Sequence, residues 1–312
     1  MSNKLRPRFA ALSHKWGAAL TVLVLGATAP TTSFAGAALD KIRDSGRVRF
    51  AYLPQAKPFT SASASGSVEG YGAALCERIA AGLKTQLGLS QLAVEWVPVT
   101  IDTAANAVAA GQADVLCTPS NATLARRKTL SFSIPTFAGG IRAVVRDDVT
   151  PQVREAIERN PKQRPVWRGT PAQGMIEATR FATVAGTSSE RWLAGAIAKF
   201  KLNTATVSVP DYASGIKFLQ QNKVDVFFAE RDVALAAMDD KAGQELEVLN
   251  RQLTHEPLAL ALPRGDEDLR LLVDTVLSKT FSAPDFADLY GKYFGKLDDQ
   301  SGTFYSWVTP AP

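Results

Sequence analysis

The chain has 312 residues, of which 46% are hydrophobic and 21% charged, and its formal net charge is +5. Four lysines and arginines and no acidic residue lie in the first 35 positions, so the remaining 277 residues carry a charge of about +1. Those residues show no basic stripe with interleaved aromatic side chains, which excludes a nucleic-acid partner. They are numerous enough for a sizeable core in one large or two smaller units.

The first 35 residues have the layout of a secretory signal peptide. Four basic residues precede an apolar run at 17–27, and Ser33 and Ala35 are small residues just before a cleavage site at Gly36. The run is too short to span a bilayer, which argues against a membrane anchor. No cysteine stands at the cleavage site, so a lipid anchor is not indicated. We therefore expect residues 1–35 to be removed and the rest to be exported.

Two cysteines, Cys76 and Cys117, lie in the exported part. An even number of cysteines in an oxidising compartment favours a disulfide, and two buried free thiols are the alternative. His255 is the only histidine after the signal, and the chain has no Cys-x-x-Cys pair. The sequence therefore predicts no metal site and suggests no cofactor.

The mature chain begins with a β-α-β-α-β series. Leucine or isoleucine recurs every fourth residue within 71–87, which predicts a helix with a buried stripe. The whole order is a helix at 39–45, a strand at 48–52, a Ser/Gly/Pro-rich loop at 54–67, the helix at 71–87, a strand at 92–97, a helix at 103–110 and a strand at 113–117. This alternation predicts an α/β fold with a parallel sheet and helices on both faces.

A second series of the same kind follows an irregular segment at 161–174, which has no assignable element and is expected to be a surface insertion. Its predicted elements are a helix at 150–160, strands at 181–185, 206–209, 224–228 and 258–262, and helices at 188–200, 211–221, 232–238, 266–281 and 285–294. Two series joined near Gly140 and Pro257 predict two lobes with two crossings. The first lobe comprises 36–140 and 257–312, and the second comprises 141–256.

The stretch from Gly111 to Arg146 holds the first group of functional candidates. Its strand ends in a polar turn at 118–121, and Thr123 is a good N-cap for the basic turn that contains Arg126. Hydroxyls and backbone N–H groups at a strand end, with a guanidinium one helical turn later, commonly bind a carboxylate. The sequence therefore predicts a carboxylate site here.

A second polar group stands at 186–190, after a strand and at the start of a helix. Thr187 and Glu190 fit a capping box. The N-terminus of that helix offers N–H groups and partial positive charge to an anion. Glu230 follows a later strand and is either a solvated acid of a first helical turn or a binding carboxylate.

The pattern G-x-x-D, then small and polar residues, then T-x-x-R-[RK] and F-S-x-P, read between 111 and 135, resembles the extracellular solute-binding proteins for polar amino acids. The cysteine before the polar turn and the T-L-A-R-R run are similar to a glutamate/aspartate-binding branch. The resemblance covers most of the chain after residue 36. It implies a periplasmic-binding-protein fold of type II, a ligand in the cleft between two closing lobes, an ABC permease as partner, a periplasmic monomer, and no catalysis.

The resemblance also implies roles for residues at matching positions. Arg126 would hold a ligand carboxylate with help from Asn121 and Thr123, and Thr187 or Ser188 would bind the same carboxylate from the second lobe. Asn121 departs from the family, which usually has a hydroxyl residue there.

Further matching positions concern the amine and the side chain of the ligand. Glu230 stands where the family usually has an aspartate that pairs with the ligand ammonium. Tyr71 and Ile101 lie near positions whose counterparts line the side-chain pocket. Members that bind acidic ligands carry an arginine near the position of Ala104, so its absence argues against a glutamate or aspartate ligand.

The alternative is an enzyme on the same fold, similar to the cyclohexadienyl dehydratases related to this family. Such an enzyme needs a carboxylic acid in the cleft to protonate a leaving hydroxyl, and Glu230 is the candidate acid. A hydrolase is not supported, because His255 is the only histidine of the mature chain and no nucleophile elbow accompanies it.

Overall fold

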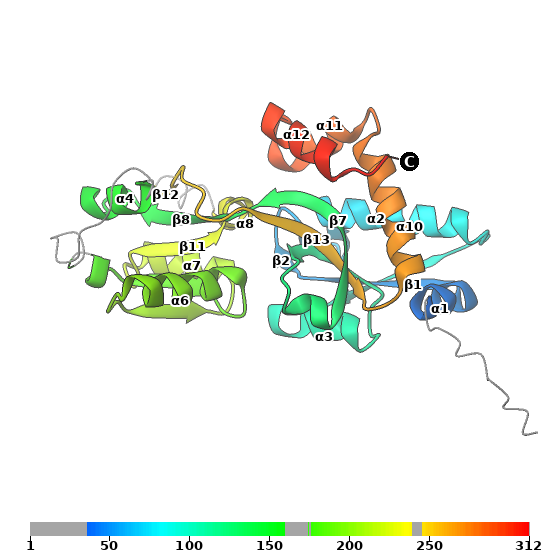
Figure 1. Ribbon diagram of the computed structural model, residues 1–312, viewed down its shortest axis with the longest axis horizontal. Coiled ribbons are helices and arrows are strands. Elements are labelled where there is room, and N and C mark those ends of the chain that lie inside the picture. The colour runs from blue at the N-terminus through cyan, green and yellow to red at the C-terminus, as the bar shows by residue number, and fades with distance from the viewer. Residues whose placement is uncertain (1–35, 160–173, 175, 239–244, 312) are drawn as a thin grey trace, which may run out of the picture. The chain divides into compact units, whose positions relative to one another are not determined.

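The computed structural model describes residues 36–159, 174, 176–238 and 245–311. The predicted signal peptide and most of the unassigned segment at 161–174 lie outside these ranges. Figure 1 shows the order of the elements along the chain. Among the helices in the described ranges, none combines the length and the apolar character needed to cross a membrane.

The first sheet has the strand order β5-β1-β6-β13-β7. Its strands are β1 (Arg47–Tyr52), β5 (Ala93–Pro98), β6 (Val115–Asn121), β7 (Leu130–Gly139) and β13 (Glu256–Pro263). The pairs of β1 with β5 and β6 are parallel, as the β-α-β series predicts, whereas β13 runs antiparallel to β6 and β7. The late strand predicted near 258–262 therefore returns to the first sheet.

Helices cover both faces of this sheet. They are α1 (Ala37–Ser45), α2 (Tyr71–Gln86), α3 (Ile101–Ala109), α10 (Glu267–Phe281), α11 (Phe286–Phe294) and α12 (Asp299–Val308). Val115 and Cys117 of β6 pack into the cluster that holds α2 and α10, and Leu116 packs into the one that holds α3. Both faces of β6 are thus buried, which explains its continuous apolar sequence. The sequence did not predict α12.

The predicted loop at 54–67 is partly regular. A small antiparallel sheet, β2-β3-β4, is formed by Gln55–Ala56, Thr60–Ala62 and Val68–Glu69. In α2 the predicted stripe is buried at Leu75, Ile79 and Leu83. Leu87, the last predicted member, is the C-cap of this helix.

The second sheet has the order β10-β9-β11-β8-β12. Its strands are β8 (Ile141–Arg146), β9 (Phe181–Val184), β10 (Thr206–Val209), β11 (Val226–Glu230) and β12 (Leu246–Val248), and its helices are α4 (Pro151–Glu158), α6 (Ser188–Phe200), α7 (Tyr212–Gln220) and α8 (Arg231–Ala237). The three strands of the second β-α-β series are parallel, and β8 and β12 are antiparallel to their neighbours. The α/β architecture with two sheets agrees with the predicted fold class.

An ion pair between an arginine and an aspartate stands at the start of the third strand in each of the two series. Asp114 accepts hydrogen bonds from the backbone N–H and the guanidinium of Arg49, at 2.8 and 2.7 Å. In the second sheet Asp225 does the same with Arg180, at 2.8 and 2.7 Å. Burial would raise the pKa of Asp225, but the hydrogen bonds from Arg180 outweigh this and lower it. The aspartate of the G-x-x-D motif therefore has a structural partner.

The two segments that join the sheets lie against each other. Ile141 N–H donates to Thr254 Oγ1 at 3.0 Å, and Gln252 Nε2 donates to Gly139 O at 3.2 Å. A Cβ atom at Gly140 would lie 2.2 Å from the carbonyl oxygen of Thr254. Only glycine permits this close approach of two backbones.

Candidate functional site

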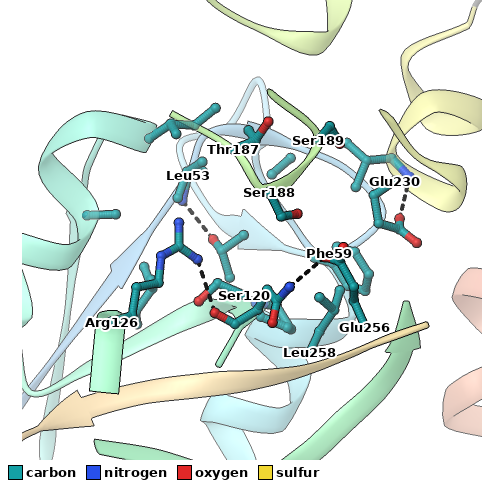
Figure 2. A pocket seen from close by; sticks show the side chains of 18 of the residues that line it. Leu53, Phe59, Ser120, Arg126, Thr187, Ser188, Ser189, Glu230, Glu256 and Leu258 are labelled. Atoms are coloured by element: carbon teal, nitrogen blue, oxygen red, sulfur yellow. Dashed lines mark hydrogen bonds between the residues drawn. The ribbon is translucent and has the colours of Figure 1, made fainter. Parts of the chain in front are cut away.

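One cavity is lined by residues of both sheets (Figure 2). The first sheet and its loops contribute apolar walls and a polar strand end, including Leu53, Leu116, Thr118, Ser120 and Asn121. The second sheet contributes the loop before α6, the start of α7 and the end of β11. The carboxyl ends of parallel strands are the usual place for a ligand in open α/β sheets.

Arg126 lines this cavity from a short 3₁₀ helix, Arg126–Lys128, that follows β6. Its backbone N–H donates to Thr123 Oγ1 at 3.2 Å, and its guanidinium donates to Asn121 O at 3.3 Å. Within the described ranges it forms no ion pair. Burial lowers the pKa of Arg126, and the positive charge of Arg191 lowers it further. A partly buried guanidinium with free donors is suited to an anionic group.

The polar segment at 118–121 differs from the predicted turn. It continues β6, and β13 pairs with it in antiparallel register, with Leu258 opposite Asn121. Thr118 Oγ1 accepts from Leu53 N–H at 2.9 Å and shares a 2.6 Å hydrogen bond with the hydroxyl of Thr60. The polar side chains are therefore held on a strand, which is more rigid than a turn.

The start of α6 presents uncapped N–H groups. Thr187 is the N-cap, but its hydroxyl donates to Val184 O at 2.6 Å and makes no capping bond. Glu190 accepts instead from Gly186 N–H, at 2.9 Å. The predicted capping box is thus wrong, since the Thr187 hydroxyl bonds back to the strand. Thr187 and Ser188 line the cavity together with the first-turn N–H donors.

Glu230 ends β11 and is the N-cap of α8, where its carboxylate accepts from Asp232 N–H at 3.0 Å and Val233 N–H at 3.2 Å. Burial raises the pKa of Glu230 to about 8, and repulsion from Asp232 contributes in the same direction. Glu230 is thus a partly buried N-cap that lines the cavity and is not a solvated acid of the first helical turn, while ligand binding by its carboxylate stays a prediction.

The structure places the other predicted residues as follows. Asn121 and Ile101 line the cavity, whereas Thr123 supports the turn behind Arg126. Tyr71 does not reach the cavity. It is fully buried in the core of the first sheet, where its hydroxyl bonds to Thr136 O and to Tyr305, both at 3.0 Å. The predicted pocket position of Tyr71 is therefore wrong, because the C-terminal helix α12 covers it.

Among the lining residues that sequence reasoning missed, Tyr212 and Glu256 carry titratable side chains. Tyr212 directly follows the N-cap Asp211 of α7, the position that Ser188 has in α6, and this parallel was the available signal. Glu256 begins β13 and accepts a hydrogen bond from the amide of Asn121 at 2.6 Å. Nothing local marks Glu256, since it reaches the cavity only through pairing with a distant strand.

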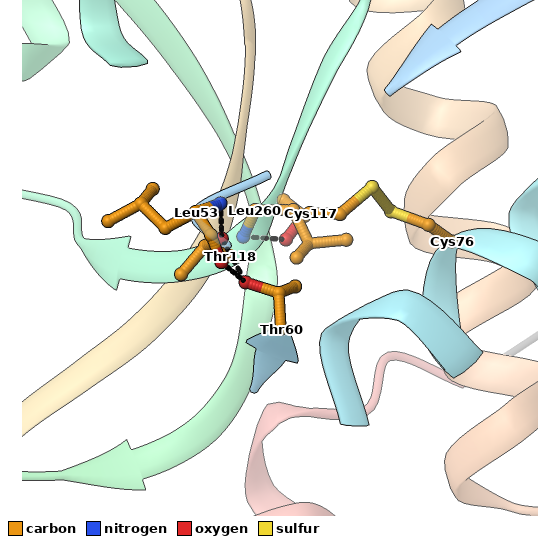
Figure 3. The surroundings of a disulfide bond; sticks show 7 residues. Leu53, Thr60, Cys76, Cys117, Thr118 and Leu260 are labelled. Atoms are coloured by element: carbon orange, nitrogen blue, oxygen red, sulfur yellow. Dashed lines mark hydrogen bonds between the residues drawn. A yellow bond between two sulfur atoms is a disulfide. The ribbon is translucent and has the colours of Figure 1, made fainter. Parts of the chain in front are cut away.

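The predicted disulfide between Cys76 and Cys117 is present (Figure 3), with Cα atoms 6.0 Å apart. It ties α2 to β6 one residue before Thr118. The bridge therefore stabilises the strand that carries the polar wall of the cavity.

A family model for bacterial extracellular solute-binding proteins, family 3, matches residues 48–296. The chain belongs to this family. The L-glutamate/L-aspartate-binding protein of Pseudomonas aeruginosa is 22% identical over 258 residues, which are 82% of this chain and 79% of that protein.

Two solved structures have similar folds. One is an ancestral amino-acid-binding protein described as a precursor of cyclohexadienyl dehydratase, with a TM-score of 0.65, 23% identity and coverage of 82% of this chain and 98% of its own. The other is a putative ABC-transporter binding component from Wolinella succinogenes in complex with lysine, with a TM-score of 0.63, 20% identity and coverage of 82% and 97%. At these identities the likeness concerns the two-lobed fold, which agrees with type II of the periplasmic binding proteins.

Proposed function

We propose that this protein is the periplasmic substrate-binding component of an ABC importer and captures an amino acid or a related small molecule between its lobes. One observation carries the proposal: Arg126, without an ion-pair partner in the described ranges, lines the same cavity as the carboxylate of Glu230. An α-amino acid has the complementary pair of charges.

In this proposal Arg126 holds the ligand carboxylate, and Thr187 and Ser188 add hydroxyl and N–H donors from the start of α6. Glu230 receives the ammonium group. The apolar wall near Ile101 accepts part of the side chain. One hydrogen of the Asn121 side-chain amide is donated to Glu256. The second amide hydrogen and the side-chain oxygen Oδ1 therefore remain for the ligand.

The lobes are assigned as 36–140 with 257–312, and 141–256. Their two crossings lie side by side at Gly140 and Thr254, so a small change of backbone dihedrals there would open and close the cleft. The family membership and the signal-like residues 1–35 support export to the periplasm as a monomer that delivers its ligand to a permease.

The test compares Arg126→Ala with Arg127→Ala. Arg127 is exposed, and its side chain donates to Ala122 O and lies over the ring of Phe132. Removing a charge-assisted contact from a closed cleft leaves the ligand charge buried and unpaired. Arg126→Ala should weaken binding at least ~100-fold, or roughly 2.7 kcal/mol, and Arg127→Ala should be nearly neutral.

A thermal-shift screen of amino acids, opines and small carboxylates identifies the ligand for this test, since a ligand at 100 times its Kd adds ~2.7 kcal/mol. Calorimetry then compares the two variants, and circular dichroism checks that both are folded. Equal binding by the two arginine variants would remove Arg126 from the carboxylate site.

A second function, a dehydratase-like lyase, is supported by one observation: the pKa of Glu230 is raised to about 8, as a general acid requires. Glu230→Gln separates the two. In a binding protein it lowers the affinity for amino acids more than for carboxylates without an amine. In a lyase it abolishes turnover of prephenate-like substrates and spares their binding. Absence of turnover in the wild type would exclude the lyase.

A further inference from the structure

A second carboxylate, Glu256, lies in the same cavity and has no role in a simple α-amino-acid site. In the first sheet Glu256 stands opposite Gly139, and in the second Glu230 stands opposite Ile141. The two carboxylates therefore flank Gly140, where the chain first crosses between the lobes. Figure 2 shows both glutamates on the side of the cavity away from Arg126.

The charges of this cavity are unbalanced. Arg126 would be neutralised by a ligand carboxylate, and Glu230 by one ammonium group. Glu256 then has no partner within ion-pair distance in the described ranges, because its hydrogen-bond donor is the neutral amide of Asn121, and the charge of Arg126 acts on it only across the cavity. An uncompensated carboxylate in a closing cleft is costly unless a positive group joins it.

Tyr212 gives an independent indication of a polar ligand group at the same place. Its hydroxyl has no hydrogen bond to any residue in the described part of the chain, although burial raises the pKa of Tyr212 strongly. Tyr212 lines the same cavity as Glu230, Arg126 and Glu256, and the charges of these three residues act on its hydroxyl. Tyr212 is half-buried in the cavity wall, and a tyrosine hydroxyl that a bound ligand shields from water normally has a hydrogen-bond partner. A ligand group between the two glutamates would provide one.

We propose that the ligand has one anionic and two cationic groups, as a dibasic amino acid does, and that Glu230 and Glu256 each pair with one cation while Tyr212 hydrogen-bonds between them. This rests on the proposed function and narrows it. Apolar residues of the wall, among them Leu53, accommodate the methylene groups between the charges. In the described part of the chain a second ligand carboxylate would meet two glutamates and one lining guanidinium, Arg126, with the exposed Arg191 acting from outside the lining, so acidic amino acids are disfavoured despite the relative that binds them.

The experiment uses ligand pairs of equal shape and different charge. Arginine is compared with citrulline, in which a neutral urea replaces the guanidinium, and ornithine with norleucine, in which a methyl group replaces the second amine. Calorimetry of the mature protein should show arginine or ornithine bound at least ~100-fold more tightly than its neutral partner, a ratio typical of one charge pair in a closed cleft.

Glu256→Gln, which keeps the shape of the side chain and the contact to Asn121, should reduce that ratio to less than ~10-fold without weakening the neutral ligand. Glu69→Gln is the matched control, since Glu69 is exposed on β4. If Glu256→Gln does not fold, the wild-type ratios of affinity for charged and neutral ligands decide whether the ligand carries two cations.

The outcomes are distinct. If charged and neutral partners bind alike and Arg126→Ala weakens both, the proposed function stands and the two-cation ligand is refuted. Preferred binding of glutamate or aspartate also refutes it. If the folded wild type binds no amino acid at all, the proposed function and this inference both fail. A high ratio that is unchanged in Glu256→Gln refutes the role of Glu256.

Discussion

Ligand binding at Glu230 should release a proton near neutral pH. Burial, and then repulsion from Asp232, raises the pKa of Glu230 from its ordinary value of 4.5 to about 8, although N–H groups of Asp232, Val233 and Gly140 act in the opposite direction. Arg142 and Tyr212 also face this carboxyl. In the empty cleft at pH 7 the protonated form therefore dominates, whereas an ammonium ligand requires the carboxylate.

The sign of the pH dependence follows from this difference. Because the bound form holds one proton fewer, affinity should rise with pH by up to tenfold per unit below about 8 and level off above it. Each such unit corresponds to about 1.4 kcal/mol. Folding without ligand has the opposite trend. A carboxyl whose pKa is raised on folding contributes most below 4.5, and this stability is lost as the pH rises from there to about 8.

Calorimetry at several pH values between 5.5 and 8.5, in two buffers of different ionisation enthalpy, measures the number of protons released. We expect close to one proton at pH 6.5 and about a quarter of a proton at pH 8.5. Glu230→Gln should release no proton on binding. Between pH 5 and pH 8 the free energy of unfolding of the wild type should fall, as measured by denaturant titration, and that of Glu230→Gln should fall less. Affinity that is independent of pH, with no proton release, would show that Glu230 does not meet the ligand amine.

Three further predictions concern the framework of the site. Reduction of the bridge between Cys76 and Cys117, which are 41 residues apart, should lower the free energy of unfolding by about 4 kcal/mol in denaturant titrations, and two thiols titrating without reductant would refute the bridge. Gly140→Ala should cost ~1–3 kcal/mol by overpacking against Thr254 O, whereas Gly302→Ala, with nothing near its Cβ, should be neutral or stabilising. Intact mass of the periplasmic product should begin at or within a few residues of Gly36, and a membrane-bound product that retains Met1 would contradict export.

The sequence predicted well what depends on local pattern. The helices and strands of both β-α-β series follow from apolar periodicity, and Arg126, Ser188 and Glu230 were found because each stands just after a strand. Elements that depend on distant partners were predicted less well. Residues 118–121 look like a turn, since they contain proline and three polar residues, but β13 extends the strand through Asn121.

The errors at the site have the same origin. Tyr71 was predicted from a family position that lines the side-chain pocket, yet α12, which lies more than 200 residues later, buries its hydroxyl against Tyr305. Glu256 is one charged residue before a proline in the sequence, and only the pairing of β13 with β7 brings it to the cavity. Such residues cannot be assigned from local signals, because their environment is made by tertiary contacts.

The aspartate of the G-x-x-D motif and the residues that line the cavity lie at opposite ends of the strands, so the motif does not by itself indicate which ligand is bound. Asp114 of the G-x-x-D pattern is bound by Arg49 at the amino end of β6, and Asp225 by Arg180 at the corresponding end of β11. These pairs lie at the start of a strand in each sheet and do not line the cavity. Most groups that face the cavity stand at the opposite, carboxyl ends of the parallel strands, where Glu230 is the last residue of β11. A residue can change there without disturbing the pairs beneath, so the motif identifies the family while the ligand is decided by the charges at the cleft.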